Sequence, residues 1–172
     1  EEAIYNALID KYQEALEAEE AISEETALGI YQELVDFYEN QSVYNQIYRD
    51  AQYYYSYAAG RLAFSRQEYI EAQEWFEDLA KAGKTDADWK NLSFYNDFCL
   101  AMFYFEEGDI VEALPLFAQA RQENDEAVNL CTQRIADCGE KIEELIRSGY
   151  EGRLISLKGG INGWAREVDP SI

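Results

Sequence analysis

Tyr69-Ile-Glu-Ala-Gln-Glu-Trp-Phe-Glu-Asp-Leu-Ala80 is the stretch that decides the fold, because its layout occurs twice more in the chain. A large apolar residue is followed after three positions by alanine, after four more by an aromatic residue, and then by a small or aliphatic residue. A second copy spans residues 110–120, and a fainter one spans residues 25–34. The three alanines lie 45 and 41 residues apart, at Ala27, Ala72 and Ala113. A repeat of this length predicts a helical solenoid, an architecture whose extended surfaces bind other proteins.

The composition of the chain favours one folded, strongly acidic domain. Its 172 residues are 48% hydrophobic, which is enough to build a core. The net charge is −21, from 35 acidic against 14 basic residues, which argues against nucleic acids and anionic membranes as partners. The acid is concentrated in residues 1–48, where Lys11 is the one basic residue beside twelve acidic ones. This face is either simply solvated or suited to a basic partner.

Neither membrane insertion nor a disulfide framework is predicted. No apolar run reaches the ~18–20 residues of a membrane span, and no signal peptide is visible. Three cysteines, Cys99, Cys131 and Cys138, are interpreted as buried apolar residues and favour a reducing compartment, the cytoplasm first. The alternative is a soluble domain of an anchored or exported protein, because the chain begins without Met and is expected to be an excised or processed piece.

Apolar periodicity predicts helices along most of the chain, since two prolines occur and no stretch before residue 150 alternates as a strand. Ser23 is predicted to cap the second helix and Asp109 the sixth. Ser65–Glu68 and Thr85–Asp88 have the spacing of capping boxes and are predicted to open the fourth and fifth helices. The first, second, third and seventh helices are expected at about residues 2–19, 24–40, 44–65 and 125–148, and the fourth and fifth end near Gly83 and Gly108.

The composition changes at Gly149, because five of the ten glycines lie within residues 149–163. Residues 153–158 are predicted as one short strand, followed by a turn at Gly159-Gly160. The chain is therefore divided into a helical repeat domain, residues 1–148, and a glycine-rich tail, residues 149–172. This tail either packs on the last helix or begins a truncated following segment.

The paired helices resemble the tetratricopeptide repeat family, in which two antiparallel helices cross closely at a small residue. Gly60 and Ala101 each stand twelve residues before a repeat alanine, where the family has this small residue, and Tyr104 and the turn at residues 107–109 also match. The resemblance implies an all-α, right-handed superhelical solenoid of about three antiparallel helix pairs. A C-terminal capping helix and a short irregular or β tail complete the expected fold.

This resemblance covers about residues 53–122 well and residues 1–52 weakly. The chain departs from the family in its repeat length, since the family unit has about 34 residues. It also lacks the early tryptophan of the family repeat, because Ser56 and Asp97 stand in that place. Longer first helices or wider loops are the expected adjustment.

Residues 157–170, Leu-Lys-Gly-Gly-Ile-Asn-Gly-Trp-Ala-Arg-Glu-Val-Asp-Pro, resemble the end of a rhodanese domain, which has a strand, a Gly-Gly pair and a helix bearing Trp. The resemblance implies sulfur transfer through a loop cysteine, for which Cys131 or Cys138 is available. Neither cysteine is followed by the glycine and arginine of the family loop, and both lie within a predicted helix. Sulfur transfer therefore stays a remote alternative.

The residue types needed for catalysis are largely missing. The chain has no histidine, which removes the usual general base, the Ser-His and Cys-His pairs and the commonest transition-metal ligand. Residues 159–163 lack the Lys and Ser/Thr of a phosphate-binding loop, and no Asp-rich calcium loop occurs. Carboxylates that are adjacent in a helix point in different directions. We therefore predict that the protein is not an enzyme and uses no catalytic residue, cofactor or metal.

An aromatic groove is the predicted functional site. In a solenoid of helix pairs the first helix of each pair lines the concave face, and aromatic residues, Met and Arg are enriched where partners bind. A competing interpretation is that such an aromatic stripe forms core. The residues predicted to line the groove are Tyr54, Tyr57, Arg61, Phe64, Tyr95, Phe98, Met102 and Phe105.

The predicted function is protein–protein interaction, in which the groove holds an apolar or basic peptide or partner segment. One alternative is a structural or self-associating spacer in a larger chain, so the oligomeric state is left open. The other is the sulfur-transfer role described above.

Overall fold

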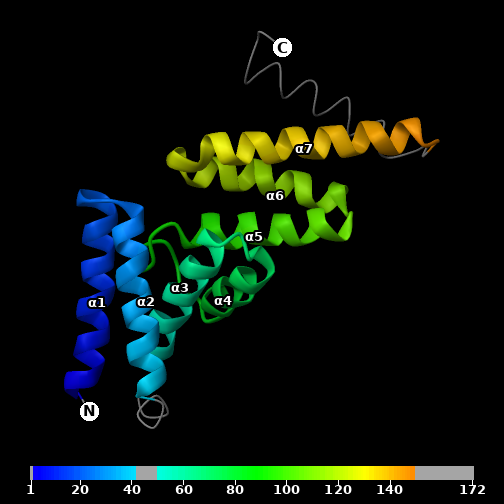
Figure 1. The fold of residues 1–172 in the computed structure, drawn as a ribbon. Helices are drawn as coiled ribbons and strands as arrows, with labels where there is room; N and C mark the ends of the chain where they lie inside the picture. The colour runs from blue at the N-terminus through cyan, green and yellow to red at the C-terminus, as the bar shows by residue number, and fades with distance from the viewer. Residues whose placement is uncertain (1, 42–49, 150–172) are drawn as a thin grey trace. The chain divides into compact units, whose positions relative to one another are not determined.

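The computed structural model describes residues 2–41 and 50–149, and all of their regular structure is helical (Figure 1). The predicted all-α class is therefore confirmed for these residues. None of the described helices is long and apolar enough to cross a membrane. The strand predicted at residues 153–158 lies outside the described residues. The helices are α1 (Glu2–Ala21), α2 (Glu24–Asn40), α3 (Ala51–Ser65), α4 (Tyr69–Lys81), α5 (Leu92–Glu107), α6 (Ile110–Glu123), a short 3-10 helix η1 (Asp125–Ala127) and α7 (Val128–Arg147).

Consecutive helices pack against each other, as expected for helical repeats. α1 packs on α2, α2 on α3, α3 on α4, and α6 on α7 (Figure 1). The chain divides into two compact units, and the boundary follows Cys99, within α5. We call residues 2–41 and 50–99 unit 1 and residues 100–149 unit 2.

The repeat positions found in the sequence are core positions in the structure. In α2, α4 and α6 the alanine, the aromatic residue after it and the following small or aliphatic residue are all fully buried. A small buried residue stands twelve positions before each alanine, and Ala15 adds the first helix pair to this pattern. The three sets are Ala15, Ala27, Tyr31 and Leu34; Gly60, Ala72, Phe76 and Leu79; and Ala101, Ala113, Phe117 and Ala120.

Gly60 shows why a small residue is needed where two helices cross. A Cβ atom built on Gly60 would lie 2.8 Å from two ring carbons of Phe76. Phe76 is fully buried, so its ring has little room to move away. The close contact between α3 and α4 therefore depends on glycine at this position.

Several helix boundaries agree with the predictions. Ser23 caps α2, because its Oγ accepts a hydrogen bond from the Thr26 N–H at 3.2 Å. Asp109 directly precedes α6, although its side chain makes no capping hydrogen bond. Gly83 and Gly108, with φ of 74° and 84°, follow the ends of α4 and α5 in the left-handed conformation that glycine adopts without strain.

The capping box predicted at Ser65 is wrong. Ser65 is the last residue of α3, and its hydroxyl donates to the Leu62 carbonyl at 2.7 Å. Gln67, with φ of 63°, then turns the chain, and α4 begins at Tyr69 without a side-chain cap. The Ser65 hydroxyl thus binds a carbonyl of α3, the helix that it ends, and does not cap α4. The spacing of a capping box does not reveal this competing hydrogen bond.

The box predicted at Thr85 is also wrong, because α5 begins seven residues later at Leu92. The carboxylate of Asp86 accepts a hydrogen bond from the Ser93 N–H at 2.7 Å, so the first turn of α5 is satisfied from a distant residue. Trp89, which lies between Asp86 and Ser93 in the sequence, is 4% exposed and belongs to the core of unit 1. This long-range burial keeps the segment out of the helix.

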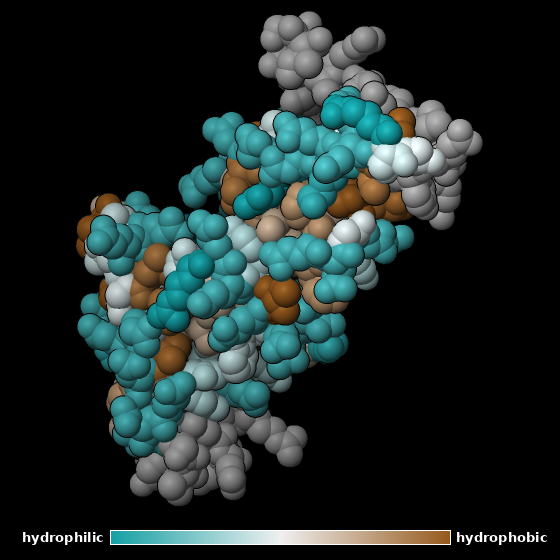
Figure 2. Space-filling view, turned by 45° about the vertical axis from the view of Figure 1, so that its right-hand side comes forward, coloured by the Kyte–Doolittle hydropathy of each residue, from teal (hydrophilic) through white to brown (hydrophobic). Residues whose placement is uncertain are grey.

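The surface is mostly hydrophilic in the view of Figure 2, in keeping with a net charge of −21. Large apolar side chains that are exposed within the described ranges are few, namely Ile22, Ile70 and Leu130. The described surface is therefore mainly polar, and its aromatic rings are at most partly exposed.

Candidate functional site

The eight residues predicted to line a groove divide into buried and partly exposed ones. Five are at most 5% exposed, so a partner cannot reach them on the folded surface; they are Tyr57, Arg61, Tyr95, Phe98 and Met102. Tyr54, Phe64 and Phe105 are partly exposed. For the five buried residues, the structure agrees with the competing interpretation that the stripe forms core.

All three partly exposed residues also pack against neighbouring rings. Phe64 makes edge contacts with Tyr95 and Phe98, at centroid distances of 5.0 and 5.5 Å. In unit 2, Phe105 lies 6.3 Å from the Phe117 ring. Tyr54 packs against the rings of Tyr12 and Trp89 and, unlike Phe64 and Phe105, lines the pocket described below.

A buried ion pair joins α1 to α3 in unit 1. The Arg61 guanidinium donates from Nη1 to Glu19 Oε2 at 2.8 Å and from Nη2 to Glu19 Oε1 at 3.1 Å. The Arg61 side chain is 1% exposed and the Glu19 side chain 12%. Glu24, in the first turn of α2, lies 3.7 Å from the same guanidinium. Two parallel hydrogen bonds are the strong form of pairing between arginine and a carboxylate. Through Glu19 and Glu24, Arg61 connects α3 to both α1 and α2.

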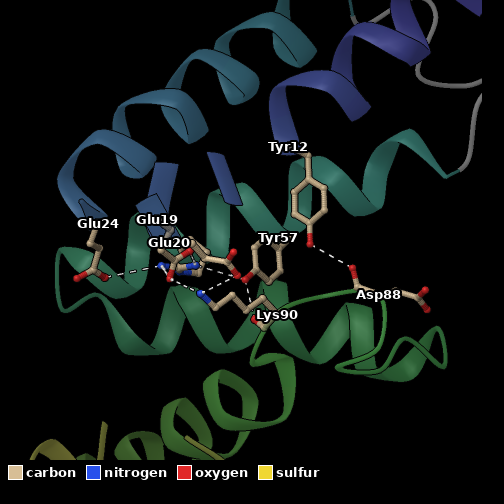
Figure 3. Close-up of polar contacts among 8 residues, drawn as sticks. Tyr12, Glu19, Glu20, Glu24, Tyr57, Asp88 and Lys90 are labelled. Carbon is tan, nitrogen blue, oxygen red and sulfur yellow. Dashed lines mark hydrogen bonds and ion pairs between the residues drawn. The ribbon is translucent and has the colours of Figure 1, made fainter. Parts of the chain in front are cut away.

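Lys90 reaches the same acidic cluster from the segment before α5. Its Nζ lies 3.9 Å from Glu19 Oε1 and 3.8 Å from Glu20 Oε1 (Figure 3). Its backbone carbonyl accepts a hydrogen bond from the Tyr57 hydroxyl at 2.7 Å. The segment is therefore held to both α1 and α3.

Three tyrosine rings surround the Arg61 guanidinium. Its Cζ lies 5.4, 5.9 and 4.7 Å from the ring centroids of Tyr31, Tyr57 and Tyr95. The Tyr57 hydroxyl also accepts a hydrogen bond from Nη1 at 3.3 Å. Arginine spreads its charge over a planar group that is weakly hydrated, so aromatic faces offset part of what it loses on leaving water.

The groups around Arg61 keep their charge states far from neutral pH. Burial raises the pKa of Tyr31, Tyr57 and Tyr95, and the opposing effect of the Arg61 charge is smaller. Burial alone would lower the pKa of Arg61, but Tyr95, Tyr57 and the hydrogen bond to Glu19 hold it well above its ordinary value. None of these four groups is poised to exchange a proton near pH 7.

A pocket of about 430 Å³ opens beside this cluster, and aromatic side chains form much of its wall. Tyr12 and Trp89 lie at its floor, since they are 5% and 4% exposed and their ring centroids are 5.0 Å apart. Tyr54 packs on both, at 5.2 and 4.9 Å. The partly exposed rings of Tyr5 and Tyr53 complete the wall. We call this the aromatic pocket.

Hydrogen bonds fix the floor of the aromatic pocket. The Tyr12 hydroxyl donates to the Asp88 carbonyl at 3.1 Å (Figure 3), on one side of Trp89. The Tyr57 hydroxyl binds the Lys90 carbonyl on the other side. Trp89 is thus pinned from α1 and from α3, and the floor is in place before any ligand arrives.

The aromatic pocket carries two carboxylates, Asp50 and Asp88, and one ammonium group, Lys84. The Lys84 Nζ lies 4.3 Å from the centroid of the Tyr53 ring. Within residues 2–41 and 50–149, neither carboxylate forms an ion pair. Burial raises the pKa of Tyr54, and Tyr5, Asp50 and Asp88 raise it further, so both carboxylates act on this hydroxyl.

The three cysteines are buried free thiols, as the sequence predicted. Burial raises the pKa of Cys131 to about 11 and that of Cys138 to about 12. A thiol that is protonated at neutral pH is a weak nucleophile. The part of the chain that the structure describes also holds no group of three His, Cys, Asp or Glu residues able to bind a metal.

Sequence reasoning missed most of the aromatic pocket and predicted Tyr54 alone. A signal existed for α1, because Tyr5 and Tyr12 are seven residues apart and so share one helix face. For Trp89 and Asp88 no signal was available, since their segment was expected to be helical. Glu19 was equally hidden, because nothing local distinguishes it from the other acidic residues of α1.

Comparison of the chain with protein-family models, with curated proteins and with solved structures found no match. What the chain does is therefore inferred from its repeats and from the geometry of the aromatic pocket.

Proposed function

We propose that the protein is a protein–protein interaction module, a right-handed solenoid of three helix pairs that resembles tetratricopeptide repeats and is closed by α7. Support comes from the packing of consecutive helices and from the common register of the small residue, the alanine and the aromatic residue in all three pairs. Repeats of this kind rarely carry chemistry and present extended surfaces to polypeptides.

The observation that carries the interaction is the aromatic pocket. Tyr5, Tyr53 and Tyr54 are partly exposed, above a floor that Tyr12 and Trp89 already fill. Tyrosine and tryptophan are the side chains most enriched at binding hot spots, and sites for ligands are commonly concave and formed in advance. The proposed contact surface therefore moves from the predicted eight-residue groove to this pocket, and Tyr54 belongs to both.

The test compares capture of partners by three proteins. The parent chain is used beside a pocket variant, Tyr5→Ala/Tyr54→Ala, in pull-downs from the extract of the source organism. The matched control is Tyr38→Ala/Tyr55→Ala, which removes a stacked tyrosine pair, 4.6 Å between centroids, from the α2–α3 contact. Circular dichroism checks that all three are folded.

A partner captured by the parent and the control, and lost by the pocket variant, would support the proposal. Capture of nothing, or capture of every partner by the pocket variant, would reject it. In that case a concentration-dependent dimer in sedimentation would favour the self-associating spacer instead.

A further inference from the structure

The aromatic pocket has the composition that recognises cations. Aromatic faces attract ammonium and guanidinium groups, and the attraction grows when the cation leaves water. Five aromatic side chains line the pocket beside Asp50 and Asp88. The chain itself provides an example, because the Lys84 ammonium lies 4.3 Å from the centroid of the Tyr53 ring.

The two carboxylates are available for a cation from outside. Asp50 stands at the start of α3, but its side chain makes no capping hydrogen bond. Asp88 uses its backbone carbonyl to bind Tyr12, which leaves its exposed carboxylate unengaged by that contact. In the described parts of the chain neither carboxylate is in an ion pair, and two carboxylates face one ammonium in this pocket. An added positive charge would correct that imbalance.

We infer that the aromatic pocket binds a lysine or arginine side chain presented by a partner polypeptide. This inference rests on the proposed interaction function and names what the partner must offer. A cavity of about 430 Å³ accommodates one long side chain. The hydrogen bonds of Tyr12 and Tyr57 hold Trp89 in place, so little ordering is needed on binding.

The charge of the molecule favours a polypeptide with basic residues over a neutral one. The chain carries a net charge of −21, and α1, which supplies Tyr5 and Tyr12, belongs to its most acidic part. Such a field draws basic segments towards the pocket and speeds their association. Raising the salt concentration is therefore expected to slow binding.

The experiment uses the full chain and a short glycine- and serine-based peptide with a single arginine. The comparison peptide carries citrulline, which has the shape of arginine without its charge. NMR follows the indole N–H of Trp89, assigned with Trp89→Phe; this buried group has no hydrogen-bond acceptor among the described residues and reports on the floor. We expect the arginine peptide to shift this signal in a saturable way and the citrulline peptide to leave it unchanged.

The variant Asp50→Asn/Asp88→Asn is expected to bind the arginine peptide about tenfold more weakly, since two charge-assisted contacts are lost. The control, Glu74→Gln/Asp78→Asn, makes the same change of net charge on exposed positions of α4 and should bind like the parent. Equal shifts by both peptides, or parent-like affinity of the asparagine variant, would overturn the inference. Tighter binding of tetramethylammonium than of the arginine peptide would overturn the inference that the cation comes from a partner polypeptide.

The two proposals fail in different ways. If a partner captured by the parent is lost by Tyr5→Ala/Tyr54→Ala but kept by Asp50→Asn/Asp88→Asn, the interaction function stands and the cation inference falls. If no partner is captured at all, the interaction function itself falls.

Discussion

At the scale of single residues, Arg61 carries a charge into the core of unit 1, where Glu19 meets it with both carboxylate oxygens. Attraction between the two groups is strong because little water separates or screens them, but removing both charges from water is also costly. The pair therefore adds little in net terms while it is intact. Its loss is expensive, because one charge then stays buried without its partner.

We predict that Arg61→Ala lowers the free energy of unfolding by about 3–5 kcal/mol. The comparison is Lys11→Ala, which removes a pair of 2.8 Å whose side chains are 28% and 68% exposed. Surface pairs of this kind contribute only about 0–1 kcal/mol. Urea unfolding followed by circular dichroism measures both variants. Equal losses would mean that burial does not set the strength of the Arg61 pair.

A second prediction concerns the thiols of Cys131 and Cys138. Because burial raises their pKa to about 11 and about 12, they are expected to react slowly with an aromatic disulfide reagent at neutral pH. Reaction should become fast once the protein is unfolded in guanidinium chloride. A thiol that reacts fast in the folded protein would contradict this and revive the sulfur-transfer alternative.

At the scale of helices, the crossing of α3 and α4 depends on the missing side chain of Gly60. Alanine is the better helix former by about 0.5–1 kcal/mol, so helix propensity alone favours replacement. Packing opposes it, since a Cβ atom would come within 2.8 Å of a fully buried ring. Which effect wins is decided by whether Phe76 can move.

We predict that Gly60→Ala destabilises the protein by about 1–3 kcal/mol, because overpacking a close-packed contact outweighs the gain in propensity. The matched control is Gly29→Ala, inside α2, where an added Cβ atom would meet nothing within 4 Å. This control should be more stable than the parent by about 0.5–1 kcal/mol. Thermal unfolding of both variants, with changes of opposite sign, is the expected result; two stabilised variants would show that the crossing can relax.

How far the sequence predicted these elements follows from the range of the forces involved. Helix existence was predictable from Ala72 and its repeats, because apolar periodicity is a local signal. The start of α5 was not, because Asp86 caps it across seven residues and Trp89 is held by partners in α1 and α3. The aromatic pocket shared this difficulty, since its walls come from three separate segments.

At the scale of the whole molecule, the 14 tyrosines make the stability of the folded state sensitive to alkaline pH. Tyr12, Tyr31, Tyr57 and Tyr95 are among those buried in unit 1, and burial raises the pKa of each of these four above its ordinary value of 10.0. The folded state then holds the phenolic proton more tightly than the unfolded state does. Their contribution is complete below pH 10 and is lost as the pH rises further.

We therefore predict unfolding in alkali above about pH 10, driven by ionisation of these four tyrosines and aided by the growing negative charge of an already acidic chain. Tyrosinate absorbance and helical circular dichroism are followed together during the titration. The part of the absorbance change that comes from the buried tyrosines, at the higher pH, should coincide with the loss of helix. Full ionisation of all tyrosines near pH 10, with the helices intact, would contradict this prediction.

The long reach of the contacts in unit 1 also bears on how the protein is made. Glu19 finds its guanidinium 42 residues further along the chain, and Tyr12 finds its carbonyl acceptor 76 residues further along. On the ribosome, α1 and α2 therefore emerge well before the groups that complete them. The hairpin of α1 and α2 lacks these partners until the segment around Trp89 has left the exit tunnel, so unit 1 cannot complete its core before that segment emerges.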